Sequence, residues 1–272
     1  IDFAQALQMY FKYKGSGRTK AFYAANERAA YLVINTIGNK PLSDYSRPEA
    51  LLLRDHLLSK NLAGSSISRI FAHINAIFNF AVSEYCYEIG NPFKSVYFDR
   101  TAGVIARKPM PIADIRKLQK ICFELDDDIR WLVSIISDTG MRLGEAAGLA
   151  IDDFIELNGD VPFVRVRNHP WRRLKTTCSE REIPLVGSAL WAAKRIQINV
   201  NNNRFAFPRY NRGGYTSGGS ASASINKWMR CNVSKGYTVH SLRHSLRDRL
   251  RAVQCPSEMI DQIGGWTPTT VG

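Results

Sequence analysis

The sequence contains no long apolar run and no close pair of cysteines. No stretch approaches the roughly 20 apolar residues that a membrane-spanning helix needs, and the start does not resemble a signal peptide. The cysteines are scattered, and no histidine lies at a spacing from them that suits zinc: Cys86, Cys122, Cys178, Cys231 and Cys255. A disulfide framework and a zinc site are therefore not indicated, and a reducing cytoplasm fits best. We expect no membrane association, no metal and no other cofactor.

Acidic residues are few relative to basic ones. The 272 residues include 37 Lys and Arg against 24 Asp and Glu, which gives a formal net charge of +13. Composition alone leaves open a basic protein that is merely soluble, but an excess of this size usually covers a face that meets a polyanion. The length allows two domains with a sizeable core. Because the first residue is Ile1 rather than methionine, we expect an upstream segment.

Residues 1–93 carry a helical pattern of apolar side chains. The pattern is clearest from Ile67 to Val82, where apolar residues recur at three- and four-residue spacing. Gly64 breaks the chain before this stretch, and Ser65 or Ser66 can cap the exposed amides of the helix. The sequence therefore predicts a compact helical domain over residues 1–93.

Residues 94–108 show no sustained period and carry four positive charges. We interpret them as a linker that either follows a DNA backbone or is an ordinary solvated connector. From residue 109 the pattern is mixed, and residues 201–224, rich in Asn, Gly and Ser, are expected to form a surface loop. Helices are predicted at 112–125, 129–137, 142–149, 225–229, 241–253 and 257–263, and strands at 161–166 and 182–185. The expected fold is mostly α with a small β-sheet (α+β), and its second, mixed α/β domain covers residues 109–272.

Arg142 is the first candidate for chemistry. It follows a break at Thr139-Gly140 and begins a short helix, whose free amides and dipole favour an anion. Glu145 lies three residues later on the same face and could orient a basic group by a charge-assisted hydrogen bond. Taken alone, an Arg and a Glu at this spacing are more often a surface ion pair.

His240 and Arg243 form a second candidate pair. They are also three residues apart, and a helix that starts at Ser241 would direct both toward one side. A lone histidine here would more often cap a helix or fill a core. Arg247, on the same helix, is more plausibly a phosphate-positioning or surface residue. Lys175 lies in a polar turn between the two predicted strands and could donate a proton to a departing alkoxide, although a single turn lysine is usually just solvated.

The joint order of these segments resembles the tyrosine recombinase, or phage integrase, family. The segments are Thr139-Gly140-Met141-Arg142-Leu143-Gly144-Glu145, Leu174-Lys175-Thr176, Arg181-Glu182-Ile183-Pro184-Leu185, His240-Ser241-Leu242-Arg243-His244 and Ile263-Gly264-Gly265-Trp266. The match covers nearly the whole chain, because residues 55–93 also look like the end of the family's helical core-binding domain. The part from residue 109 looks like its catalytic domain.

The resemblance implies roles for single residues. Arg142 and Arg243 would bind the non-bridging oxygens of the scissile phosphate, through bonds that strengthen as charge develops. His240 would assist proton transfer or orient the phosphate, and Lys175 would protonate the leaving 5′ oxygen. Trp266 stands where most members carry a second histidine and some carry tryptophan, so its indole N–H can donate a hydrogen bond but cannot act as an acid or base.

The family's nucleophile is a tyrosine a short distance beyond the Gly-Trp segment, and no tyrosine follows Trp266. Tyr237 precedes His240 and matches no nucleophile position. We therefore expect the nucleophile just after Gly272, outside these 272 residues. The residues expected to contact DNA elsewhere are Arg69, Arg107, Lys108 and Arg247.

The resemblance implies a cytoplasmic, bacterial or phage-encoded enzyme that cleaves and rejoins double-stranded DNA through a 3′-phosphotyrosyl intermediate. It would integrate or excise a prophage or genomic island as a homotetramer on DNA, with accessory DNA-bending proteins as possible partners. Two alternatives remain: an inactive DNA-binding protein derived from a recombinase, and a type IB topoisomerase. A third, an RNA-binding helical protein, would require stacking aromatic residues and no such set of basic residues.

Overall fold

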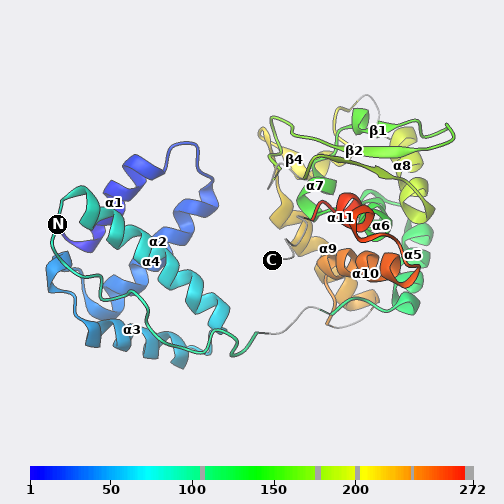
Figure 1. The fold of residues 1–272 in the computed structure, drawn as a ribbon. Helices are drawn as coiled ribbons and strands as arrows, with labels where there is room; N and C mark the ends of the chain where they lie inside the picture. The colour runs from blue at the N-terminus through cyan, green and yellow to red at the C-terminus, as the bar shows by residue number, and fades with distance from the viewer. Residues whose placement is uncertain (105–107, 175–178, 200–202, 234–235, 267–272) are drawn as a thin grey trace. The chain divides into compact units, whose positions relative to one another are not determined.

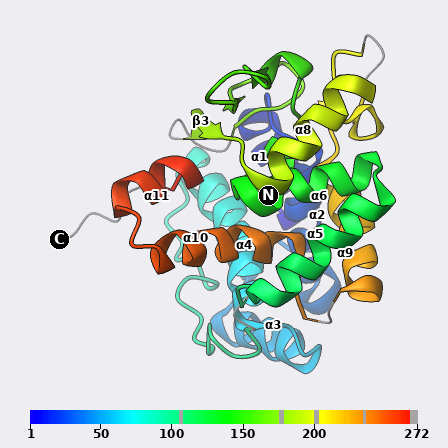
Figure 2. The same cartoon turned by 90° about the vertical axis from the view of Figure 1, so that its right-hand side faces the viewer.

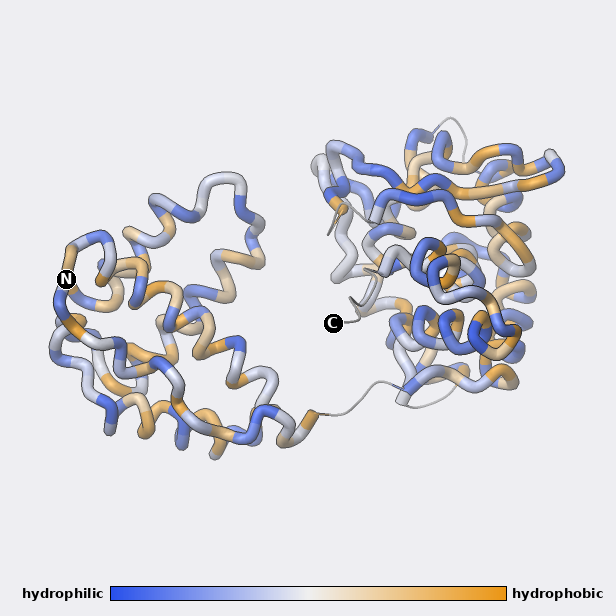
Figure 3. The backbone as a smooth tube through the Cα atoms, viewed as in Figure 1, coloured by the Kyte–Doolittle hydropathy of each residue, from blue (hydrophilic) through white to orange (hydrophobic). Residues whose placement is uncertain are grey.

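The computed structural model describes residues 1–104, 108–174, 179–199, 203–233 and 236–266. The chain divides into two compact units, residues 1–106 and 107–272 (Figure 1). Each unit has its own cluster of buried apolar side chains. Figure 3 shows apolar and polar residues alternating along the helices, as expected for helices with one buried face. No helix in the described ranges is both long enough and apolar enough to cross a membrane.

The described part of the first unit is helical, as predicted. Its α-helices are α1 (Phe3–Lys14), α2 (Lys20–Ile37), α3 (Arg47–Ser59) and α4 (Gly64–Glu84), and a 3₁₀ turn at Leu42–Asp44 precedes α3. Helix α4 packs against α1 and α2 (Figure 1). Its apolar stripe is buried, which confirms the helical pattern read from the sequence: Ile67, Phe71, Ile74, Ile77 and Phe78.

The start of α4 differs from the prediction. A serine cap at position 65 or 66 was expected, but the helix begins at Gly64 with Ala63 at the N-cap position, and no side chain caps it. The Gly64 amide donates instead to the carbonyl of Ala102 (2.8 Å), so a later stretch of backbone replaces the capping side chain. A Cβ at Gly64 would lie 2.2 Å from a backbone oxygen of that stretch, so only glycine fits here.

Much of the predicted linker packs on the first unit. Val96 is buried, and the ring of Phe98 stacks on Phe71 of α4 at 5.7 Å between centroids. The guanidinium of Arg47 donates to the carbonyls of Pro92 and Ser95, at 2.8 and 2.9 Å. The interpretation of residues 94–108 as a solvated linker is therefore corrected for residues 94–104, because apolar contacts and carbonyl hydrogen bonds hold this segment to the helices.

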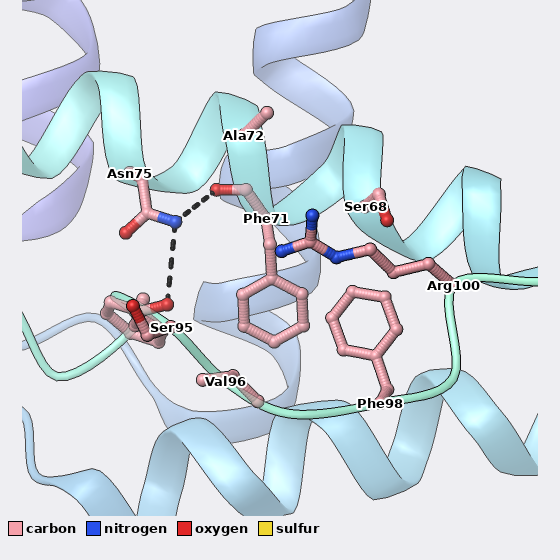
Figure 4. Close-up of a pocket in the computed structure, with 9 residues that line it drawn as sticks. Ser68, Phe71, Ala72, Asn75, Ser95, Val96, Phe98 and Arg100 are labelled. Carbon is pink, nitrogen blue, oxygen red and sulfur yellow. Dashed lines mark hydrogen bonds between the residues drawn. The ribbon is translucent and has the colours of Figure 1, made fainter.

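A cavity of about 280 Å³ lies between α4 and this segment (Figure 4). The rings of Phe71 and Phe98 form one side of it, and the side chain of Arg100 extends across α4 toward Ser68. The amide of Asn75 donates to the carbonyl of Phe71 at 2.8 Å. The segment after residue 93 therefore covers α4 but leaves a space between itself and the helix.

The second unit is built around α6. Helix α6 (Asp128–Thr139) lies at the centre and packs against α5, α8 and α10 (Figures 1 and 2). The other described helices are α5 (Ile112–Leu125), α7 (Leu143–Ala147), α8 (Gly187–Asn199), α9 (Gly218–Asn232), α10 (Val239–Ala252) and α11 (Ser257–Gly264). Nearly every α6 side chain from Trp131 to Ser137 is buried, so this helix forms the core to which the site residues are attached.

Short antiparallel strands complete the second unit. Strands β1 (Phe154–Ile155), β2 (Phe163–Val166) and β3 (Arg181–Pro184) form one sheet in the order β1-β2-β3. In the β2–β3 pair, Val164 lies opposite Ile183. Strands β4 (Asn211–Arg212) and β5 (Tyr215–Thr216) form a separate hairpin. This architecture confirms the prediction of a mostly α fold with a small β-sheet.

The prediction of a surface loop over residues 201–224 was wrong for most of its described part. A 3₁₀ turn at Pro208–Tyr210 leads into the β4–β5 hairpin, and α9 begins at Gly218. The side chain of Asn211 is buried and donates to the carbonyls of Ala147 and Phe207, at 2.7 and 2.9 Å. Polar side chains such as Asn211 thus form hydrogen bonds that fix this segment in place. Helix α8 was not predicted, because its buried face is largely alanine and gives a weak apolar signal.

One buried carboxylate joins four helices of the second unit. Asp138, on α6, accepts hydrogen bonds from Gln119 of α5 (3.0 Å) and from Arg249 of α10 (3.0 Å). Its other oxygen accepts from the hydroxyl and the amide of Ser188 at the start of α8, at 2.6 and 2.9 Å. The Asp138 side chain is 11% exposed, so its loss would leave these donors without their acceptor in a largely dry environment.

We predict that Asp138→Ala lowers the free energy of unfolding of the second unit by about 2–4 kcal/mol, because it leaves a half-buried guanidinium unpaired. The matched control is Asp160→Ala, at an exposed position, where the change should stay within about 0.5 kcal/mol. Urea unfolding followed by circular dichroism measures both. Equal losses in the two variants would contradict the assignment of Asp138 as a junction of the helices.

Candidate active site

Arg142 stands at a sharp turn between α6 and α7. Helix α6 ends at Gly140, whose φ of 62° is left-handed, and a Cβ there would lie 2.6 Å from the side chain of Leu246. Arg142 then occupies the N-cap position of α7. Its Nη1 donates to Glu145 Oε1 at 2.6 Å, and its Nη2 donates to the carbonyl of Gly265 at 3.1 Å. The turn thus brings the guanidinium to the C-terminal end of α11.

Glu145 is 5% exposed and does not form a surface ion pair with Arg142. Its Oε2 accepts from the backbone amide of Arg142 and from Nη2 of Arg181, both at 3.0 Å. Burial pushes the pKa of this carboxyl up, but the charge of Arg181 and the hydrogen bonds from Arg142 and Arg181 outweigh burial and hold the pKa below its ordinary value of 4.5. Glu145 thus contacts two basic groups, the guanidiniums of Arg142 and Arg181, and its predicted role in orienting a basic group stays a prediction.

Arg181 was quoted in the sequence only as part of a motif, yet its side chain is 3% exposed and lies in the site. Its Nε donates to the carbonyl of Ile263 (2.8 Å) and its Nη1 to the carbonyl of Ser179 (2.7 Å). Burial lowers its pKa, and Glu145 partly offsets this. Period-2 alternation in β3 was the available signal, because it places Arg181 on the same face as the buried Ile183.

Arg243 reaches the site from α10. The helix begins at Val239 after Thr238, so the expected start at Ser241 is corrected: the Ser241 hydroxyl lies inside the first turn and accepts from the Thr238 amide (3.2 Å). Arg243 is 3% exposed, and its Nη1 donates to the carbonyl of Gly140 at 2.6 Å. Burial, followed by the charge of Arg142, lowers the pKa of Arg243 to about 10. This side chain is held beside Arg142 at a cost in solvation.

His240 lies on the same helix, three residues before Arg243. Its ring is half-buried and packs edge-on against that of His244, with centroids 5.0 Å apart. The helical spacing places it about one turn from Arg243. His240 therefore belongs to the helix that carries the buried arginine.

Trp266 closes the site from the C-terminal side. Its ring lies 4.3 Å from the Cζ of Arg243 and 4.9 Å from that of Arg247, both within cation–π range. Arg247 also pairs with Asp261 of α11 at 3.3 Å. The indole rests on Gly264, where a Cβ would lie 1.7 Å from the ring. The structure thus brings Arg142, Arg243 and Trp266 together.

The arginines of the site outnumber its buried carboxylate. Arg142, Arg181 and Arg243 surround Glu145 within the described residues, so their charges are only partly balanced. Burying excess like charge is costly unless a counter-charge enters the site. Guanidiniums that are desolvated and fixed in direction suit a tetrahedral anion whose charge increases during a reaction. Among the described residues, no cluster of three or more His, Cys, Asp or Glu could hold a metal ion.

The remaining predicted residues lie in different places. Lys175 and Arg107 lie outside the described residues. Arg69 is on the exposed side of α4 in the first unit, and its Nη2 is 3.4 Å from the hydroxyl of Ser66. Lys108 is exposed ahead of α5. Arg247 packs on Trp266 and pairs with Asp261, and its contact with DNA stays a prediction.

Residues 110–271 match the model of the phage integrase family. This segment is more than half of the chain and includes every site residue described above, which confirms the resemblance seen in the sequence. No curated protein matches the sequence significantly.

The fold is similar to solved integrase structures. One is the Tn1549 transposon integrase in complex with transposon right end DNA, with a TM-score of 0.74 and 19% identity, covering 97% of this chain and 91% of that chain. Another is a lambda integrase tetramer bound to a Holliday junction, with a TM-score of 0.76 and 15% identity, covering 100% of this chain and 76% of that chain. A third is a lambda integrase dimer bound to a COC′ core site, with a TM-score of 0.75 and 15% identity, covering 99% of this chain and 75% of that chain. At these identities the likeness establishes the fold.

We predict that Glu145→Gln lowers the free energy of unfolding by about 3–5 kcal/mol at pH 7, because it leaves buried guanidiniums without a counter-charge. The pKa of Glu145 is lower in the folded protein than in the unfolded chain. Its contribution is therefore present above pH 4.5 and is lost as the pH falls through the folded-state pKa. Urea titrations between pH 3 and pH 7 should show the two proteins converging at the acid end. Glu182→Gln, in an exposed pair with Arg165, is the control.

We also predict that inorganic phosphate stabilises the protein by occupying the site. At a phosphate concentration about 100 times its Kd, the free energy of unfolding should rise by about 2.7 kcal/mol over chloride of equal ionic strength. Arg243→Met should remove most of this gain, whereas Arg195→Met, at a partly exposed pair with Asp126, should keep it. Thermal melting in the two salts provides the measurement, and an equal phosphate effect in both variants would mean that the anion acts elsewhere.

Proposed function

Because this chain belongs to the phage integrase family, we propose that it is a site-specific DNA recombinase that cleaves and rejoins DNA through a 3′-phosphotyrosyl intermediate. One observation carries the proposal. Arg142 and Arg243, 101 positions apart in the sequence (243 − 142), are held side by side in a site with more guanidiniums than carboxylates. A scissile phosphodiester supplies the missing negative charge.

In the proposed reaction a tyrosine oxygen bonds to phosphorus, and the bond from phosphorus to the 5′ oxygen breaks. Arg142 and Arg243 hold the non-bridging oxygens and bind them more strongly as charge builds up in the transition state. Lys175 gives its proton to the departing 5′ oxygen, while His240 assists proton transfer or orients the phosphate. Trp266 orients the phosphate and keeps Arg243 in place. The energy of the broken bond is kept in the phosphotyrosyl link, so religation needs neither ATP nor a metal.

The nucleophile in this proposal is a tyrosine carried beyond Gly272. Residues 267–272 contain none, and Tyr237 precedes the site helix. In the structure Trp266 lies two residues after the end of α11, and the carbonyls of Ile263 and Gly265 tie this end to Arg181 and Arg142. A chain that continues from Trp266 therefore starts at the edge of the phosphate pocket, which supports the assignment.

The partner in this proposal is double-stranded DNA, contacted by both units. The expected contacts outside the pocket are Arg69, Arg107, Lys108 and Arg247. A homotetramer on DNA is the proposed assembly, supported by the lambda integrase tetramer bound to a Holliday junction. We propose that the protein acts in the cytoplasm of a bacterium, where it integrates or excises a prophage or genomic island, with accessory DNA-bending proteins.

We predict that the full-length protein becomes covalently attached to a suicide substrate containing the site that it selects from random duplex DNA. Arg243→Lys should slow this attachment about 100-fold or more, because an ammonium cannot reproduce the fork of a guanidinium. Its Kd for the same duplex should change less than about tenfold, since other contacts supply most of the affinity. Denaturing gels and filter binding measure the two quantities.

The outcomes separate the alternatives. DNA binding without a covalent complex under any condition would point to an inactive DNA-binding protein. Covalent attachment with relaxation of supercoils but no recombination between paired sites would indicate a topoisomerase. If Arg243→Lys loses DNA affinity to the same extent as it loses covalent attachment, the catalytic role of Arg243 is contradicted.

A further inference from the structure

Arg181 joins three segments that are far apart in the sequence. Its Nη2 bonds the carboxylate of Glu145 on α7, its Nη1 the carbonyl of Ser179 just before β3, and its Nε the carbonyl of Ile263 on α11. These bonds are 3.0, 2.7 and 2.8 Å long, and the side chain is 3% exposed. All three nitrogens of this guanidinium donate to acceptors of the protein, so Arg181 acts through its neighbours.

The first of these neighbours is Glu145. One carboxylate oxygen accepts from Arg142 at 2.6 Å and the other from Arg181 at 3.0 Å. The Arg142 side chain is 27% exposed, so it has room to turn away unless its partner is fixed. The Arg181 charge keeps Glu145 ionised, and its position keeps the carboxylate from rotating. The direction of Arg142 therefore depends on Arg181.

The second neighbour is the turn at the end of α11. Gly265 has a left-handed φ of 60°, and a Cβ there would lie 2.9 Å from Nη1 of Arg181. The backbone thus packs directly against the guanidinium. The Gly265 carbonyl accepts from Arg142, and the next residue, Trp266, packs on Arg243. Moving Arg181 would shift this turn and both phosphate-binding arginines together.

We propose that Arg181 is a positioning residue that sets the geometry of Arg142 through Glu145 and of Trp266 through the turn at Gly265, an inference that rests on the proposed phosphate chemistry of this site. It does not touch the substrate. Lysine cannot replace it, because one ammonium lacks the planar fork that serves three acceptors in fixed directions.

The test compares Arg181 with a second, less deeply buried arginine of the same unit. Arg249 of α10 also pairs with a buried carboxylate, Asp138, and also donates to a carbonyl, that of Ser137, but it lies outside the site. Lys and Met variants at both positions are measured in the full-length protein, well below their melting temperatures. If Arg181→Met does not fold, Arg181→Lys gives the same comparison.

The main readout is the single-turnover rate of covalent attachment at saturating suicide DNA. Arg181→Lys should lose roughly 100-fold, as expected when reacting groups are misplaced by about 1 Å. Its Kd for DNA should stay within about threefold, and Arg249→Lys should keep the wild-type rate despite a similar loss of melting temperature. Methylguanidinium should restore part of the rate to Arg181→Ala. If the attachment rate falls in proportion to the melting temperature in both the Arg181 and the Arg249 variants, the proposal is overturned.

A second readout separates this inference from the proposed function. If the wild-type protein forms no covalent complex, the recombinase proposal fails, but Arg181 can still be judged from the affinity for inorganic phosphate by thermal melting. A tenfold weaker affinity in Arg181→Lys, with no change in Arg249→Lys, would support positioning of the anion site. Equal affinities in the two variants would overturn it.

Discussion

The buried carboxylate of Glu145 is the interaction on which the rest of the site depends. It accepts from two guanidiniums and one backbone amide, and its low pKa keeps it ionised at neutral pH. A surface pair at the same spacing would contribute little to stability. Here Glu145 and Arg181 are enclosed, so losing one of them leaves the charge of the other without a partner in a nearly dry place. The same enclosure makes the remaining positive charge available to a phosphate.

The fold places these groups by crossing helices rather than by a long loop. Gly140 ends α6 in a left-handed turn, and its carbonyl accepts a hydrogen bond from Arg243 of α10. The end of one central helix is therefore the anchor for a residue of another. Asp138, two residues earlier, ties the same two helices together through Arg249. The two helices are therefore joined by two separate contacts: Arg243 with the Gly140 carbonyl inside the site, and Arg249 with Asp138 outside it.

The sequence predicted the parts that depend on local pattern and on spacing between motifs. The helical stripe of α4, the break at Gly140 and the pairing of Arg142 with Glu145 could all be read from neighbouring residues. The alternation in β3 indicates that Arg181 is buried, but its partners could not be predicted, because they lie 36 and 82 positions away and only the tertiary fold brings them together. The segment after residue 93 was misread for a related reason. Its backbone is held by Arg47, a contact across 48 positions that no local period encodes.

The glycine pair before Trp266 has a consequence for variation at this site. On one side the indole lies against Gly264, and on the other a guanidinium lies against Gly265. Even a methyl group at either position would collide with a residue that the phosphate pocket requires. The limit at Gly264 is set by the indole ring of Trp266, and the limit at Gly265 is set by Arg181. The two glycines are therefore a steric limit on how the site can diverge while it keeps these two side chains.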